Sequence, residues 1–242
     1  MISKEEICDN LICVTVSDAG AHHRILCVPN QDAAFFDVKD EDFVIAVSDG
    51  VGSCKEAGRG SKYAVDACRL VFENIKACKL PFDNSEILKT IISEWKSQIG
   101  TENTDDFCAT LKAIFKIGRV MKLVSLGDGI VAATSNGISI MAPFVETAFT
   151  NETKCLCSHT FPGDFWVNDF VVDIYEPFVA FCCTDGAANG FVAGKELNLI
   201  NELEKSTSKD TLKRELEDLI KEIGKYIFDD KTIGVVKYEK NN

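Results

Sequence analysis

The sequence lacks any apolar run of about 18 residues or more, the length that a membrane-spanning helix requires. Its first residues, Met1-Ile2-Ser3-Lys4-Glu5-Glu6, do not have the basic and then apolar layout of a signal peptide. We therefore expect a cytoplasmic protein with no membrane span. Internal repeats, low-complexity tracts and flexible linkers are also missing, so we expect a single domain over residues 1–242.

Basic residues are few, with 26 Lys and Arg against 38 Asp and Glu and a formal net charge of -12. They are also dispersed along the chain, whereas nucleic acids and anionic membranes require a basic patch. The sequence therefore predicts no nucleic-acid partner. The negative charge suits the binding of divalent cations, and it also serves solubility.

The eleven cysteines do not form the spacing framework of a small disulfide-bonded secreted domain. Most are scattered through apolar segments, and we expect reduced core residues. The one dense cluster, Cys155-Leu156-Cys157 with His159 nearby, lacks the second ligand pair of a structural zinc site. We therefore do not expect zinc there.

The periodicity of the apolar residues predicts an α+β protein. Two amphipathic helices are predicted at 64–75 and 87–99, the second after the cap candidates Asp83-Asn84-Ser85, with a further helix at 212–223. Strands are predicted at 11–16, 43–47, 108–117, 120–126, 130–134, 138–142, 178–184 and 233–238. Consecutive strands without crossover helices indicate antiparallel pairing. Residues 143–177, with several prolines and an aromatic cluster, are predicted to be irregular.

Four aspartates each stand where an apolar run ends or gives way to a turn: Asp32, Asp49, Asp185 and Asp229. Asp49 and Asp185 are each followed by glycine, which permits a sharp turn and a close approach of the backbone. Strand ends hold side chains rigidly, and converging carboxylates would repel one another unless hard cations lay between them. The pattern predicts a metal site assembled from distant segments. For each aspartate alone, a turn residue is the alternative.

Six short motifs, taken in order, resemble those of the metal-dependent Ser/Thr protein phosphatases known as PP2C, in particular bacterial members. They are Asn30-Gln31-Asp32-Ala33, Val47-Ser48-Asp49-Gly50-Val51-Gly52, Ala109-Thr110-Leu111, Leu126-Gly127-Asp128-Gly129, Cys183-Thr184-Asp185-Gly186 and Asp229-Asp230-Lys231-Thr232. The resemblance covers nearly the whole chain. It implies a four-layer α-β-β-α sandwich of two antiparallel sheets flanked by helix pairs, with a metal cleft at one edge.

The resemblance also implies two Mn²⁺ or Mg²⁺ ions held by oxygen ligands. Asp49 would bridge both ions, Asp32 and the Gly50 carbonyl would hold one, and Asp185 and Asp229 the other. The implied reaction is hydrolysis of phosphoserine or phosphothreonine on a protein, by a water activated between the two cations. The partners would be a phosphorylated protein and an opposing Ser/Thr kinase.

Positions 27 and 189 are among those that depart from the family pattern. Cys27 stands where members commonly carry a phosphate-binding arginine, so we expect His23 or Arg24 to contact the substrate phosphate or to act as general acid. A solvated polar loop is the alternative for this pair. A third, weak ion would use Asp105, and Asn189 stands where a further acid is usual, so its neutral amide would weaken that site.

Two rival functions stay open at this point. One is a pseudophosphatase of the same fold that acts as a binding module, and the other is a hydrolase of a small phosphate compound. A narrow cleft roofed by residues 143–177 would favour the small compound, and a shallow open one would favour a protein. The aromatic residues of that segment form either a substrate flap or, the interpretation that we prefer, a hydrophobic cluster that pins a long loop.

Overall fold

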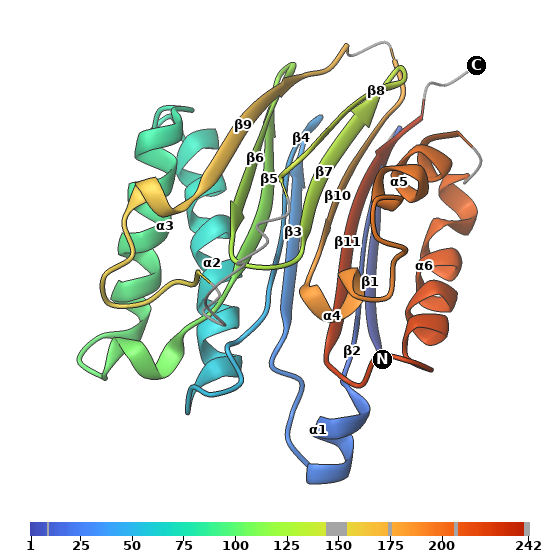
Figure 1. The fold of residues 1–242 in the computed structure, drawn as a ribbon. Coiled ribbons are helices and arrows are strands. Elements are labelled where there is room, and N and C mark those ends of the chain that lie inside the picture. The colour runs from blue at the N-terminus through green and yellow to red at the C-terminus, as the bar shows by residue number, and fades with distance from the viewer. Residues whose placement is uncertain (9, 144–153, 174–175, 206–207, 240–242) are drawn as a thin grey trace.

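Two antiparallel sheets lie at the centre of the molecule (Figure 1). The computed structural model describes residues 1–8, 10–143, 154–173, 176–205 and 208–239. In strand order, the six-stranded sheet contains β1 (Ile2–Cys8), β2 (Leu11–Asp18), β11 (Lys231–Tyr238), β10 (Phe178–Cys183), β7 (Ile130–Ser135) and β8 (Ile138–Met141). The five-stranded sheet contains β3 (Ala33–Lys39), β4 (Asp42–Ser48), β5 (Leu111–Ile117), β6 (Val120–Leu126) and β9 (Trp166–Val171).

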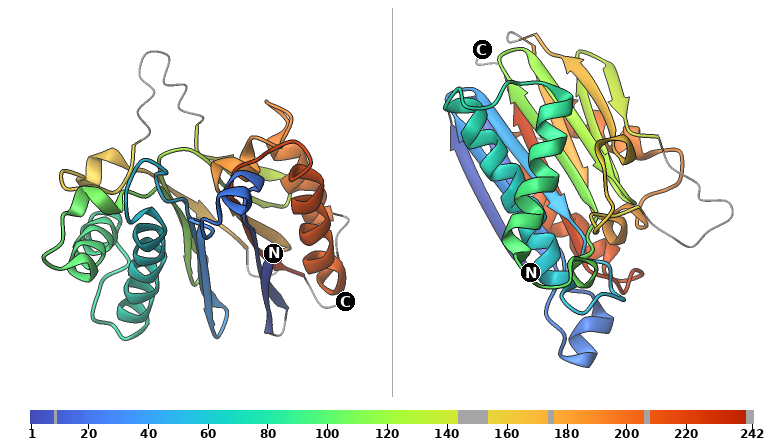
Figure 2. Two further views of the ribbon diagram at one scale, coloured as in Figure 1. Left: turned by 90° about the horizontal axis from the view of Figure 1, so that it is seen from below. Right: turned by 90° about the vertical axis from the view of Figure 1, so that its left-hand side faces the viewer.

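Helices cover the outer face of each sheet, as Figures 1 and 2 show. The pair α2 (Ala57–Lys76) and α3 (Asn84–Ile99) packs on the five-stranded sheet, and α5 (Glu196–Lys205) and α6 (Lys209–Ile223) pack on the six-stranded sheet. Short helices occupy the connections: α1 (Ala21–Leu26), α4 (Asp185–Ala188), η1 (Thr104–Phe107) and η2 (Pro162–Asp164). The predicted four-layer α+β sandwich is confirmed.

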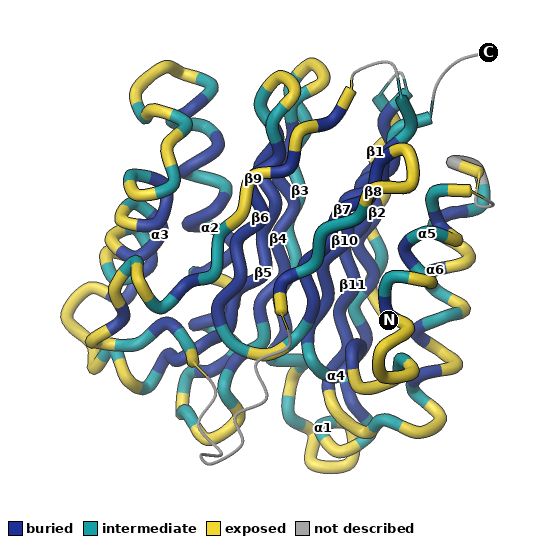
Figure 3. Tube along the Cα trace, turned by 45° about the horizontal axis from the view of Figure 1, so that its top comes forward, coloured by how far each residue is buried: buried dark blue, intermediate teal, exposed yellow. Residues whose placement is uncertain are grey.

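Three hydrophobic clusters separate the four layers, and the central strands of each sheet, such as β4, β5, β10 and β11, are buried along most of their length (Figure 3). One lies between α2, α3 and the five-stranded sheet, one between the two sheets, and one between the six-stranded sheet and the C-terminal helices. In the first cluster Trp95 is fully buried, and its indole N–H donates to the Gly60 carbonyl at 3.1 Å. A buried indole needs such an acceptor, so this contact fixes α3 against α2.

The start of α3 agrees with the cap predicted from the sequence. The Asp83 carboxylate accepts hydrogen bonds from the backbone N–H groups of Ser85 and Glu86, at 3.0 and 3.2 Å. Those donors have no partner within the helix, which explains the preference for aspartate at this position.

The prediction that residues 143–177 are irregular is wrong for 166–171. These residues form β9, an edge strand that pairs antiparallel with β6, with Trp166 opposite Ser125. Phe165 and Phe170 belong to two of the main clusters, whereas Phe161 is exposed. Polar residues on an edge strand and the preceding Pro-Gly obscured the periodicity. Within the segment 143–177, residues 144–153 and 174–175 lie outside the described residues.

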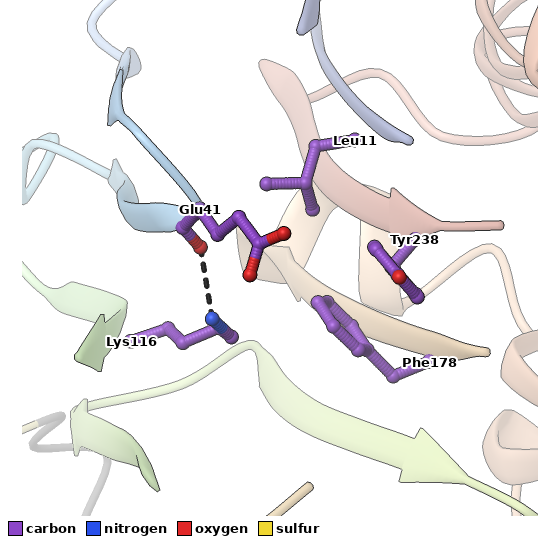
Figure 4. A pocket seen from close by; sticks show the side chains of 5 residues that line it. All are labelled: Leu11, Glu41, Lys116, Phe178 and Tyr238. Carbon is purple, nitrogen blue, oxygen red and sulfur yellow. Dashed lines mark hydrogen bonds between the residues drawn. The ribbon is translucent and has the colours of Figure 1, made fainter. Parts of the chain in front are cut away.

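The two ends of the sandwich differ in chemistry. At one end, Lys116 is buried and donates to the Glu41 carbonyl at 2.8 Å, beside Leu11, Phe178 and Tyr238, around a cavity of about 10 Å³ (Figure 4). Burial lowers the pKa of the Lys116 amine. The candidate site lies at the other end, near α1 and α4 at the bottom of Figure 1.

Across the described part of the chain, no helix combines the length and the apolar character that crossing a membrane demands.

Candidate active site

The four predicted aspartates come from both sheets, at the same end of the sandwich. Asp32 directly precedes β3 and Asp49 directly follows β4, and the pairing of Ala33 with Ser48 sets these two side by side. Asp185 begins α4 just after β10, and Asp229 lies two residues before β11. Each sheet thus contributes two carboxylates, carried on neighbouring strands.

The charges of these carboxylates act on one another. The pKa of Asp49 is raised by burial and then by the charges of Asp32, Asp185 and Asp229. Burial also raises the pKa of Asp32, and that of Asp185 is raised by burial and by the charge of Asp229. Such mutual repulsion is relieved when a cation lies among the carboxylates.

The oxygen atoms of the cluster fit divalent cations. Asp32 is 7% exposed, and its Oδ2 accepts a hydrogen bond from the Thr184 hydroxyl at 2.8 Å. Its buried Oδ1 has no hydrogen-bond partner in the described part of the protein. A buried carboxylate oxygen needs a partner, and oxygen-only donor sets select hard cations such as Mg²⁺ and Mn²⁺.

Steric contacts explain why glycine follows Asp49 and Asp185. A Cβ on Gly50 would lie 2.3 Å from the Ala57 carbonyl oxygen, and one on Gly186 would lie 2.0 Å from the Asp230 carbonyl oxygen. Real Cβ atoms do not approach backbone this closely, so only glycine lets the chain turn here. The Gly50 carbonyl, the predicted backbone ligand, stays next to Asp49 in this turn.

Substitution of Gly186 by alanine is therefore expected to disrupt the site. The new Cβ must push away the backbone of Asp230 and would also lie 3.3 Å from the Asp229 Cβ. We expect a loss of about 2 kcal/mol or more in the free energy of unfolding, together with a weaker affinity for Mn²⁺. Urea unfolding and Mn²⁺ titration measure these quantities, and Gly58→Ala, whose added Cβ would meet nothing nearer than 3.5 Å, is the control without a steric clash. An unchanged Mn²⁺ affinity in Gly186→Ala would contradict the expectation.

Asp230 organises the approach to the site, a role that the sequence analysis did not predict. It is 2% exposed, and its carboxylate accepts from the backbone N–H groups of Gly20 and Gln31, at 2.7 and 2.6 Å. It also pairs with His23 Nδ1 at 2.8 Å. Both of its oxygens are therefore satisfied by protein groups, and the adjacent Asp229 is left as the carboxylate that faces Asp185.

The predicted phosphate-binding pair lies in α1. His23 is held by Asp230, and Arg24 pairs with Asp18 at 2.5 Å with its side chain about half exposed. Cys27 ends the helix in the left-handed region, at φ 56°, and is exposed. Hence the role of His23 and Arg24 toward phosphate stays a prediction.

A pocket of about 510 Å³ opens beside Asp229, and His22 lines it together with Ile25 and Phe228. The sequence analysis named His23 and Arg24 as the phosphate contacts and did not name His22. No sequence signal distinguishes two adjacent histidines, since only the helix orientation decides which of them reaches the pocket.

The residues predicted to hold a third ion, Asp105 and Asn189, are far apart in the sequence, and each has other contacts. The Asp105 carboxylate accepts from the backbone N–H and the hydroxyl of Ser158, at 2.8 and 3.0 Å, and these bonds lower the pKa of Asp105. Asn189 is exposed at the end of α4, where its N–H donates to the Asp185 carbonyl at 2.7 Å. A third ion at these residues stays a prediction.

Lys112 is a further charged residue near the site that the sequence analysis did not single out. It is buried, donates to the Ser125 hydroxyl at 2.7 Å and to the Gly127 carbonyl, and burial lowers its pKa to about 8. The charges of Asp128 and Asp185 act on it in the opposite direction. Lys112 thus holds the turn after β6 through its bond to the Gly127 carbonyl.

Comparison with known proteins shows the family of the chain. A model of the family described as protein phosphatase 2C matches residues 19–221. The chain belongs to the protein phosphatase 2C family. A search of the curated proteins finds no match for this PP2C chain.

Solved structures of low sequence identity share the fold. The catalytic domain of the Ser/Thr protein phosphatase PstP in complex with two manganese ions is 18% identical, over 95% of this chain and 99% of PstP, with a TM-score of 0.68. RsbX in complex with magnesium is 16% identical over 98% of this chain and 100% of its own, with a TM-score of 0.63. PppA, a regulatory component of T6SS in Pseudomonas aeruginosa, is 16% identical over 96% and 99%, with a TM-score of 0.66.

Proposed function

We propose that this PP2C protein removes phosphate from phosphoserine or phosphothreonine on proteins, using two Mn²⁺ or Mg²⁺ ions. The observation that carries the proposal is the convergence of four carboxylates from two sheets, one with a buried oxygen that lacks a protein partner. Asp49 would bridge the ions, Asp32 and the Gly50 carbonyl would hold one, and Asp185 and Asp229 the other. When bound, the ions supply an activated water and offset the charge of the phosphoryl group.

Hydrogen bonds from neighbouring residues hold the aspartates in position. The Thr184 hydroxyl orients Asp32, and the Thr110 hydroxyl accepts from the Asp49 N–H at 3.1 Å. The Thr184 hydroxyl also accepts from the Thr232 N–H at 3.0 Å, which ties β11 to the end of β10. Ligands fixed in this way need little rearrangement when they take up the ions.

The surroundings of the cluster favour a protein substrate over a small phosphate compound. The pocket beside Asp229 is open, and two of its lining residues are exposed apolar side chains, Ile25 at 80% and Phe228 at 64%. Exposed apolar groups next to a charged centre suit a peptide that carries a phosphorylated residue. We further propose that the protein acts in the cytoplasm against a Ser/Thr kinase.

The rival function, a pseudophosphatase that only binds, predicts no turnover. Hydrolysis of p-nitrophenyl phosphate with Mn²⁺ separates enzyme from binding module, and a phosphopeptide panel with Mn²⁺ and Mg²⁺ then separates protein from small-molecule substrates. We expect turnover on phosphothreonine or phosphoserine peptides that EDTA abolishes. Hydrolysis of small phosphate compounds alone would favour the metabolite hydrolase.

The predicted phosphate contacts are tested by His23→Ala and Arg24→Ala. We expect at least one of them to change KM or kcat for p-nitrophenyl phosphate by about tenfold, because each would remove one charge-assisted contact or a proton donor. His22→Ala is the matched comparison, since His22 lines the pocket directly. Unchanged kinetics in both His23→Ala and Arg24→Ala would exclude a phosphate or acid role for the pair.

A further inference from the structure

Three distant segments meet beside η1, at the edge of the helical layer formed by α2 and α3. The Leu156 N–H donates to the Ala109 carbonyl at 2.8 Å, and the Val51 N–H donates to the Cys108 carbonyl at 2.9 Å. These backbone bonds join the loop after β4, the segment around η1, and residues 154–160. The cysteine cluster predicted from the sequence thus lies next to two further cysteines.

Thiols lie on both sides of Asp105 at this junction. The Sγ atoms of Cys54 and Cys108 both lie 3.3 Å from the Asp105 carbonyl oxygen. The Thr160 hydroxyl accepts from the Cys157 N–H at 2.8 Å, and it lies 3.3 Å from the Cys157 Sγ. These contacts fix the Cys157 thiol on the side of Asp105 that faces residues 154–160.

Asp105, Cys157 and His159 bring oxygen, sulfur and nitrogen ligand atoms within 4.8 Å of one another. Ser158 holds this group in place, since it bonds both oxygens of Asp105 and its Oγ lies 2.7 Å from His159 Nδ1. The Lys96 amine also donates to the Ser158 carbonyl at 2.7 Å, which fixes the turn to α3. The ligand atoms therefore lie on a backbone that is already anchored.

We propose that Asp105, Cys157 and His159 bind one thiophilic divalent cation, Zn²⁺, with solvent as the fourth ligand. Zinc takes tetrahedral sets of sulfur, nitrogen and carboxylate ligands, and binding would release the thiol proton to solvent. The four-aspartate site offers only oxygen, so the two sites select different metals. In the sequence, Cys155, Cys157 and His159 lacked a further ligand; the fold supplies Asp105 from a distant segment. Asp105 then serves this site instead of a third hard ion.

Cobalt substitution tests this site without reference to phosphatase activity. The reduced full-length protein is titrated with Co²⁺, because sulfur-bound cobalt gives a charge-transfer absorption that cobalt held by carboxylates lacks. We expect this absorption in the wild type, its replacement on addition of Zn²⁺, and its retention in Asp49→Asn. The last result separates the proposed site from the four-aspartate cluster.

Variants assign the ligands. Loss of a residue that only supports a metal ligand typically lowers metal affinity 10- to 100-fold. Loss of a direct ligand should lower it further, so we expect Cys157→Ser to weaken Zn²⁺ binding by about 100-fold or more. His159→Ala, at an exposed residue, should weaken it similarly and change the cobalt spectrum without loss of the fold, as circular dichroism would show. Cys78→Ser replaces an exposed cysteine elsewhere and should leave binding intact. Absence of the sulfur absorption in the wild type, or its persistence unchanged in both ligand variants, would overturn the proposal.

Discussion

Asp49→Asn is expected to lower Mn²⁺-dependent hydrolysis of p-nitrophenyl phosphate by about a thousandfold or more, because the proposed bridging ligand loses its charge and several kcal/mol of charge stabilisation with it. Steady-state turnover at saturating Mn²⁺ measures this loss. Asp218→Asn, at an exposed position on α6, is the control and should retain full activity. Comparable activity in Asp49→Asn and Asp218→Asn would rule out the bridging role.

The same variant is expected to be more stable than the wild type when both are free of metal. Burial and the charges of three other aspartates raise the pKa of Asp49, so its ionisation opposes folding. Removing that charge should raise the free energy of unfolding at pH 8 by about 1–3 kcal/mol. Urea unfolding in EDTA measures the difference. A destabilised Asp49→Asn would show that repulsion does not dominate the cluster.

The pH dependence of the metal-free protein has a defined sign. For a carboxyl whose pKa is raised on folding, the folded state binds more protons, so stability falls as pH rises above the unfolded pKa of about 4. Because Asp32, Asp49 and Asp185 all shift in this direction, we expect the cluster to lower the free energy of unfolding between pH 5 and pH 8. The decrease should be smaller in Asp49→Asn. A stability that rises over this range equally in both proteins would contradict the expectation.

Two adjacent aspartates are expected to give opposite results. Asp230→Ala leaves Gly20 N–H, Gln31 N–H and His23 without their acceptor, and we expect it to cost about 3–5 kcal/mol of stability. Asp229→Ala removes an exposed carboxylate whose proposed role is metal binding, so activity should fall strongly with little loss of stability.

Urea unfolding and Mn²⁺-dependent turnover, measured on both variants, decide between the two roles. Asp230→Asn keeps one acceptor oxygen and should lose less stability than Asp230→Ala. The sequence Phe228-Asp229-Asp230 cannot distinguish the ligand from the structural residue, so these measurements supply what the motif lacks. A stable, fully active Asp230→Ala would refute the organising role of that carboxylate.

The helix and sheet layers could be predicted from the sequence because the apolar residues of their main elements follow clear patterns. The amphipathic helices α2 and α3 and the continuous apolar strands β4 and β10 have strong patterns, and the Asp-Gly pairs mark strand ends that steric contacts reserve for glycine. The metal cluster was predictable because its members lie beside those strands.

The elements that the sequence did not predict lie at edges or depend on tertiary contacts. β1 is an exposed edge strand with three charged residues, and β9 is an edge strand interrupted by polar ones. Helix α1 has no buried residue, and its N-cap forms no side-chain hydrogen bond. Contacts with Asp230 hold it, and these join residues about two hundred positions apart in the sequence. No local pattern encodes contacts of that kind.

Direct counting of bound manganese tests the proposed metal centre most closely. Electron paramagnetic resonance of free Mn²⁺, recorded during titration of the full-length protein, gives the number of ions taken up. We expect two ions for the wild type and weaker, incomplete uptake for Asp49→Asn, with Asp218→Asn behaving as the wild type. A wild type that binds no Mn²⁺, or an Asp49→Asn variant that binds two ions with unchanged affinity, would contradict this expectation.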